Sequence, residues 1–234
     1  LVAFNEDEPL APGVDYMVDP ASKGIKNTVL DLVYLDKKVI KKEKHFNRFV
    51  EESYVGKAVV IDMKDFKDEK ENEFFEEIID NYMRADAIIL IKEGKNLSWH
   101  VSTRQKDFPV FIIRKEKLPK KAETIIVQLD NKFIRRYKSN NVIGMVRGKT
   151  EPEKYIVIGA HYDHLGMMGK KTYFPGANDN ASGVAMMLNL AKHYSDVFNQ
   201  PDYSIIFIGF GGEEAGLLGS KYYTENPLVP LDKV

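Results

Sequence analysis

The sequence contains no cysteine among its 234 residues. This absence excludes disulfide bonds, thiolate zinc sites and a cysteine nucleophile, but it leaves the redox compartment open. Acidic and basic residues nearly balance, with a formal net charge of -1 at pH 7, so nothing in the composition indicates nucleic acid or an anionic membrane surface as a partner. No apolar run approaches the roughly 18 residues of a membrane span. The apolar fraction of 44% is enough for a sizeable core in one large or two small domains.

Histidine is also scarce, with five residues in the whole chain. There is no His-Glu-x-x-His motif, which excludes a zincin-type protease. His45 and His100 are each isolated from any second ligand candidate and are not expected to bind metal. The first residue is Leu1, and no basic segment followed by an apolar one marks a signal peptide. We therefore expect the chain to be a processed or trimmed product.

The first 130 residues are expected to be rich in strands. Residues 1–27 contain three prolines and little periodicity, which is typical of a loop, with one extended piece expected around 14–18. The basic run at 37–44 is expected to be a solvated turn or helix face. Residues 67–84 carry apolar residues at helical spacing, which predicts an amphipathic helix. Short apolar segments typical of strands lie at 28–35, 56–62, 87–91, 109–113 and 124–129.

After residue 130 the pattern changes to alternating strands and helices. Residues 133–147 are typical of a strand, a turn and a second strand. Buried strands follow at 155–160 and 203–209, and between them lie a glycine-rich loop at 165–177 and a helix. This order of elements predicts an α/β sandwich in which helices cover the sheet.

Chemically active side chains stand at three junctions of this α/β segment. His161 and Asp163 follow one buried strand, Asp179 opens the helix, and Glu213 and Glu214 follow the next buried strand. Adjacent parallel strands deliver their carboxyl ends to one edge of a sheet, so we expect these groups to converge. An imidazole combined with carboxylates is a ligand set that suits zinc when thiolates are absent.

Each of these residues also has a purely structural interpretation. Asp179 or Asn180 could cap the helix, and His161 could be a buried structural histidine. The glutamate pair could be solvated carboxylates favoured by a helix dipole. Asp163 could be a turn residue, but two positions after His161 it is well placed to accept the second ring N–H of a metal-bound imidazole.

Two further histidines lie in the same segment. We assign His164 to the surroundings of the site or to the surface, because its side chain should point away from His161. His193 lies late in the predicted helix, where a positive charge is favourable, and it is interpreted as a surface residue.

Three motifs make the interpretation specific, and they read GAHYDH at 159–164, PGANDNASG at 175–183 and GFGGEEAGLLGS at 209–220. In order and spacing they resemble the motifs of the co-catalytic di-zinc aminopeptidases of the aminopeptidase Y type. The resemblance covers about residues 140–223. It implies a three-layer α/β/α zinc-exopeptidase fold.

The resemblance also implies a role for each candidate residue. His161 would bind one zinc ion, Asp179 would bridge two zinc ions, and Glu214 would bind the second. Glu213 would be the general base, and Asp163 would orient His161. The implied reaction is removal of the N-terminal residue of a peptide through a metal-bridging water.

Residues 28–130 contain the segments GKAVVID at 56–62, ADAIILI at 85–91 and PVFII at 109–113. With these segments, the region resembles the protease-associated domain that many of these peptidases carry ahead of the first metal motif. The expected organisation is therefore an N-terminal part of the peptidase domain at 1–27, an inserted β-rich domain at 28–130, and the first part of the metal site in a peptidase domain at 131–234. The family resemblance also implies export to the periplasm or the extracellular space.

The sequence departs from the family pattern in one respect. The family needs two further ligands, an aspartate on the next strand and a histidine well beyond it. After Glu214 the acids are Glu225 and Asp232, and no histidine follows. Residues 228–234 resemble the lead-in to the missing aspartate strand, so Asp232 is not expected to be that ligand. We expect the chain to be truncated at its C-terminus, with an incomplete metal site.

Two other functions stay open at this point. A related enzyme with one zinc ion cyclises N-terminal glutamine, and the glutamate pair does not separate it from an aminopeptidase. A non-catalytic, receptor-like relative would be expected to lose metal ligands or the base. Because the metal-ligand candidates and the base candidate are all present, an aminopeptidase acting on peptides is the leading prediction.

Overall fold

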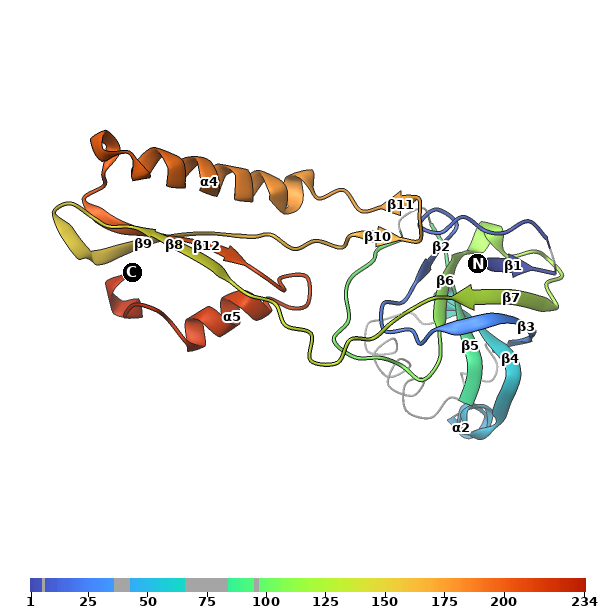
Figure 1. Cartoon of the computed structure of the whole chain (residues 1–234). Coiled ribbons are helices and arrows are strands. Elements are labelled where there is room, and N and C mark those ends of the chain that lie inside the picture. The colour runs from blue at the N-terminus through green and yellow to red at the C-terminus, as the bar shows by residue number, and fades with distance from the viewer. Residues whose placement is uncertain (6, 36–42, 66–83, 95–96) are drawn as a thin grey trace. The chain divides into compact units, whose positions relative to one another are not determined.

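The computed structural model of the chain describes residues 1–5, 7–35, 43–65, 84–94 and 97–234. It divides the chain into two compact units, 1–134 and 135–234 (Figure 1). The predicted helix at 67–84 falls almost wholly outside the described residues, as does most of the basic run at 37–44. None of the described helices is long and apolar enough to cross a membrane.

A seven-stranded sheet in the order β1-β7-β3-β4-β5-β6-β2 organises the first unit. Strands β3 to β6 run parallel to one another, whereas β1, β2 and β7 pair antiparallel with their neighbours. The strands are β1 (Val2–Phe4), β2 (Tyr16–Val18), β3 (Ile25–Tyr34), β4 (Ser53–Asp62), β5 (Arg84–Lys92), β6 (Val110–Arg114) and β7 (Thr124–Leu129), with helix α2 (Glu43–Glu51) between β3 and β4. All five strands predicted between residues 28 and 129 are confirmed.

The extended piece expected around 14–18 is strand β2, but the rest of the prediction for residues 1–27 needs correction, because this segment also supplies β1 and so forms both edges of the same sheet. Val2 pairs with Val127 of β7, and Met17 pairs with Ile112 of β6. Apolar side chains of β1 and β2 are buried, but strands of three residues are too short to show a periodic pattern. The described residues of 1–27 therefore group with the first unit.

The second unit is a three-stranded sheet between two helices. Strand β12 (Tyr203–Phe210) is central, parallel to β9 (Glu151–His161) and antiparallel to β8 (Val142–Val146). Helices α4 (Ser182–Ser195) and α5 (Leu218–Glu225) lie on opposite sides of this sheet (Figure 1). The predicted three-layer α/β/α arrangement is confirmed.

Alternate side chains of β12 pack against the two helices. Ile205 and Phe207 join Met187 of α4 in one apolar cluster, whereas Ile206 and Ile208 join Tyr223 of α5 in another. This alternation is the expected consequence of successive strand residues facing opposite sides of a sheet. Because both faces are covered, β12 appears in the sequence as a continuous apolar run.

Two local predictions in this unit need correction. Of residues 133–147 only 142–146 form a strand, and Phe133, Ile134 and Tyr137 are exposed. Aromatic and β-branched residues at 133–137 favour a strand, but these residues pair with no neighbour in the described part of the chain. The predicted loop at 165–177 contains a short hairpin of β10 (Met167–Met168) and β11 (Thr172–Tyr173).

Tyr223 of α5 is buried, with 6% of its surface exposed. Its buried hydroxyl group has no hydrogen-bond partner among the described residues. An unsatisfied buried polar group costs about 1–3 kcal/mol. We expect Tyr223→Phe to raise the free energy of unfolding by about 1 kcal/mol, measured by urea denaturation. Tyr155→Phe, which removes an exposed hydroxyl beside Glu153, is the matched control. A less stable Tyr223→Phe protein would contradict this prediction.

Candidate metal centre and active site

Strands β9 and β12 end side by side, and this register brings the predicted residues together. His161 is the last residue of β9 and pairs with Phe210, the last residue of β12. The segment after β9 carries Asp163, and the segment after β12 carries Glu213 and Glu214. The predicted convergence at one edge of the sheet is therefore what the structure shows.

Asp179 and Asn180 have different roles: one is a metal-ligand candidate, and the other caps the helix. The Oδ1 atom of Asn180 accepts the backbone N–H of Gly183 at 3.2 Å, which satisfies a free donor at the start of α4. Asp179 has a non-helical backbone, and its side chain is 66% exposed. Its Oδ1 atom lies 3.0 Å from Nε2 of His161. Asp179 is thus available to the site, and Asn180 caps the helix.

The two glutamates sit on a tight turn after β12. Gly212 and Gly216 adopt φ values of +74° and +101°, which favour glycine. Oε2 of Glu213 lies 3.9 Å from Nε2 of His161. Oε1 of Glu214 accepts a hydrogen bond from Nδ1 of His164 at 2.8 Å. The turn therefore places one carboxylate beside each histidine.

The Asp163 carboxylate accepts hydrogen bonds from the turn that carries the two glutamates. Its two carboxylate oxygens accept the backbone N–H groups of Glu213 at 3.1 Å and Glu214 at 3.2 Å. Nδ1 of His161 lies 3.9 Å from the Asp163 carboxylate but 3.1 Å from the Asp163 backbone carbonyl. In this structure the nearer contact to the His161 ring is thus the backbone oxygen of Asp163, and the role of its carboxylate in orienting a metal-bound His161 stays a prediction.

Both ring nitrogens of His161 face oxygen acceptors. A carbonyl oxygen can only accept, so Nδ1–H donates to the Asp163 backbone, and Nε2 faces the Asp179 carboxylate. An imidazole nitrogen and a carboxylate oxygen this close can be ligands of the same metal ion. This observation, together with the imidazole and carboxylate donors, shows that the residues fit a zinc ion.

Of the two interpretations of His164, the surroundings of the site and the surface, the structure supports the first. Ligand atoms of His164, Asp179 and Glu214 all lie within 4.8 Å of one another, and Nδ1 of His164 hydrogen-bonds to Oε1 of Glu214. The strand ends at His161, so strand alternation does not fix the direction of a side chain three residues later. Gly176 leaves room for the ring, since a Cβ atom there would lie 2.9 Å from Cδ2 of His164.

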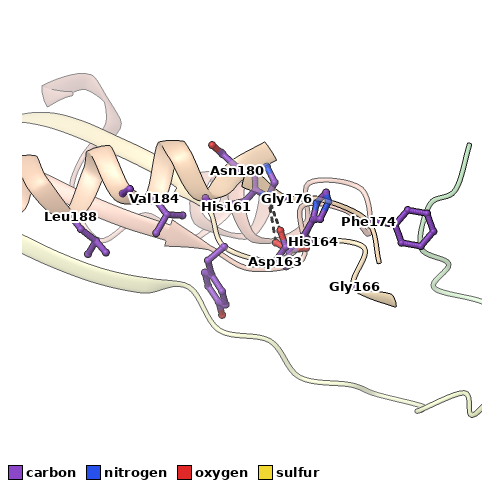
Figure 2. A pocket seen from close by; sticks show the side chains of 12 residues that line it. His161, Asp163, His164, Gly166, Phe174, Gly176, Asn180, Val184 and Leu188 are labelled. Carbon is purple, nitrogen blue, oxygen red and sulfur yellow. Dashed lines mark hydrogen bonds and ion pairs between the residues drawn. The ribbon is translucent and has the colours of Figure 1, made fainter. Parts of the chain in front are cut away.

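A pocket of about 650 Å³ adjoins these groups (Figure 2). His161, Asp163 and His164 line its polar end, near the start of α4. Val184 and Leu188 project from α4 and line an apolar wall. His193, in contrast, lies exposed in the last turn of α4, with its ring against Tyr194.

Comparison with known sequences finds relatives that match the segment containing these residues. Residues 141–234 match the model described as peptidase family M28. Aminopeptidase YwaD of Bacillus subtilis (strain 168) is 34% identical over 146 residues, which are 61% of this chain and 30% of that protein. A probable zinc metalloprotease of Pyricularia oryzae is 36% identical over 90 residues, which are 38% of this chain and 18% of that protein. The chain thus spans less than a third of the length of these curated relatives.

Solved structures share the fold. A peptidase M28 precursor from Shewanella amazonensis SB2B has a TM-score of 0.62 at 20% identity, covering 99% of this chain and 55% of that one. An aminopeptidase from Aneurinibacillus sp. strain AM-1 has a TM-score of 0.57 at 23% identity, covering 94% of this chain and 51% of that one. The match of residues 141–234 to the model of peptidase family M28 confirms the predicted resemblance, and the solved structures share the fold.

Proposed function

We propose that this protein is a zinc-dependent aminopeptidase that hydrolyses the N-terminal residue from peptides. The observation that carries the proposal is the convergence of His161, Asp179, Glu213 and Glu214 at one edge of the sheet. They lie in a segment that matches peptidase family M28, and a relative at 34% identity is named an aminopeptidase. An imidazole, a central carboxylate and a glutamate pair are the parts that metal-assisted hydrolysis needs.

The positions of the ligand candidates support two zinc ions. His161 and Asp179 would hold one ion, and Asp179 and Glu214 would hold the other. Asp179 is the shared member, because its carboxylate lies 3.0 Å from His161 and belongs to the group that it forms with Glu214 and His164. When bound, zinc supplies Lewis acidity that polarises a carbonyl and makes water a stronger nucleophile at neutral pH.

Glu213 is placed to move the proton in this reaction. Its carboxylate stands 3.9 Å from Nε2 of His161 and is outside the group of His164, Asp179 and Glu214. A carboxylate next to the ligands can accept the proton of the attacking water and return it to the leaving amine. Asp163 fixes its backbone through the Glu213 N–H. Glu213 is therefore the proposed general base.

We also propose that the first unit is a protease-associated-type domain and that the protein is exported. The motifs GKAVVID, ADAIILI and PVFII support the first proposal, and they fall on β4, β5 and β6 of its sheet. The second rests on family resemblance.

Removal of zinc tests the proposed reaction. The assay should use the longest natural product that contains residues 1–234, because this chain spans 30% or less of its curated relatives. We expect release of free N-terminal amino acids from unblocked peptides, loss of activity with a zinc chelator, and recovery when zinc is restored. Elemental analysis after dialysis against trace zinc should give two ions per protein. N-acetylated peptides are the matched control and should stay intact.

Other outcomes would identify the alternatives. Glutamine-peptides that form a cyclised N-terminus without releasing a free amino acid would indicate a cyclase. A protein that binds no zinc and processes no peptide would indicate a receptor-like function. Either result would reject the aminopeptidase proposal.

A further inference from the structure

One amide side chain joins the two ends of the turn that carries the glutamates. Asn141 lies just before β8 and far from this turn in the sequence. Its Oδ1 atom accepts the backbone N–H of Gly211 at 3.2 Å, and its Nδ2 group donates to the backbone carbonyl of Gly219 at 2.8 Å. Asn141 thus connects a residue two positions before the glutamates with a residue in the first turn of α5.

The packing around this contact explains the glycines at both ends of the motif. Gly211 and Gly219 are buried. A Cβ atom on Gly219 would lie 2.5 Å from Oδ1 of Asn141, and one on Gly211 would lie 2.9 Å from the carbonyl oxygen of Asn140. The Tyr162 hydroxyl donates to that same carbonyl at 2.6 Å. The segment before β8 is therefore fixed against the turn at a distance that only glycine permits.

The turn itself is a compact unit that needs external anchors. The backbone carbonyl of Glu213 accepts the N–H groups of Gly216 and Leu217, both at 2.8 Å, and Leu218 N–H donates to Gly212 at 3.0 Å. Asp163 anchors the middle of the turn through the glutamate N–H groups. Asn141 anchors its two ends. Together they determine where the two carboxylates lie relative to His161 and Asp179.

We propose that Asn141 is a positioning residue that holds Glu213 and Glu214 in the geometry that zinc binding and proton transfer need. The proposal rests on the proposed function and adds to it a residue that touches neither substrate nor metal. Loss of both hydrogen bonds would free the ends of the turn, whereas β12 would keep its pairing with β8 and β9. The effect should be local.

Two variants test this role. Asn141→Ala removes both hydrogen bonds, and we expect kcat to fall about 100-fold, as for a small misplacement of reacting groups, with little change in KM. Zinc affinity should fall, and hydrogen exchange should speed up at residues 211–219 but not in β9 or α4. Asn141→Asp keeps the acceptor for Gly211 N–H and loses the donor to Gly219, so kcat should fall by a smaller factor, about tenfold, while the Gly211 amide stays protected.

Asn189→Ala is the matched control, because Asn189 also donates from Nδ2 to a backbone carbonyl, that of Ala185 at 2.8 Å, but on the exposed surface of α4. It should change neither kcat nor exchange in the turn. Unchanged zinc affinity and exchange in both Asn141 variants would overturn the proposal. Uniformly faster exchange over the whole second unit would also overturn it, since that indicates a general structural role.

The readouts separate this proposal from the proposed function. A wild-type protein without aminopeptidase activity would reject the function. Zinc affinity and local exchange at residues 211–219 would still decide whether Asn141 positions the glutamates.

Discussion

Glu213→Gln is expected to abolish turnover while the protein keeps its zinc. Glutamine has nearly the same shape as glutamate, and the backbone N–H of residue 213 can still donate to Asp163. The amide cannot accept a proton from water, so general-base catalysis is lost. Such catalysis is worth about 100-fold to 10,000-fold, and we expect kcat to fall toward the upper end of that range. Steady-state kinetics and zinc analysis of the same sample measure both quantities.

The matched control for this change is Glu225→Gln. Glu225 is an exposed acid at the end of α5, and its replacement should leave kcat and zinc content unchanged. Near-normal activity of Glu213→Gln would show that another group is the base. Loss of zinc from the same variant would show that Glu213 is a ligand, and the roles of the two glutamates would have to be reassigned.

The sheet edge and its chemistry could be predicted because they depend on patterns that are local in the sequence. The apolar segments at 155–160 and 203–209 are buried strands, and both are followed at once by polar, glycine-rich turns. Parallel strands with such turns deliver their side chains to one edge. The pairing of His161 with Phe210 confirms this expectation.

Hydrogen-bond partners beyond the strand ends could not be predicted in the same way. The path of the chain after His161 depends on the turn after β12, which is more than forty residues away. Asp163 therefore binds the glutamate N–H groups, and His164 turns toward Glu214. Asn141 had no signal in its own neighbourhood, because its partners are the glycines of a distant motif.

The edge strands of the first unit were difficult to predict from the sequence for a related reason. A strand of three residues has too few positions for alternation to be visible, so the sequence predicts β1 as loop and β2 only as an extended piece without a partner. Their pairing with β7 and β6 is decided by burial of Val2, Phe4 and Met17. In the second unit the opposite error occurs at 133–137, where a local pattern typical of a strand is present but a pairing partner is not found among the described residues.

Asp179→Ala should release zinc from the protein and thereby remove activity, because Asp179 is the carboxylate shared by the two proposed ion positions. Its Oδ1 atom is 3.0 Å from His161, and it forms a group with His164 and Glu214. Without it, each proposed ion loses a ligand in the same step. The fold should tolerate the change, since this side chain is 66% exposed and makes no helix cap.

Asn180, the neighbouring residue, provides the control for this test. Asn180→Ala removes the hydrogen bond to Gly183 N–H and should lower the free energy of unfolding by about 1 kcal/mol while zinc is retained. Asp179→Ala should show the reverse, with zinc lost and stability of the zinc-free protein unchanged. Zinc analysis and urea denaturation of both variants measure the zinc content and the free energy of unfolding, which should change in opposite variants. If Asp179→Ala retained its full zinc content, the shared-carboxylate arrangement would be wrong, and the ions would have to be held by His161, His164 and the glutamates without it.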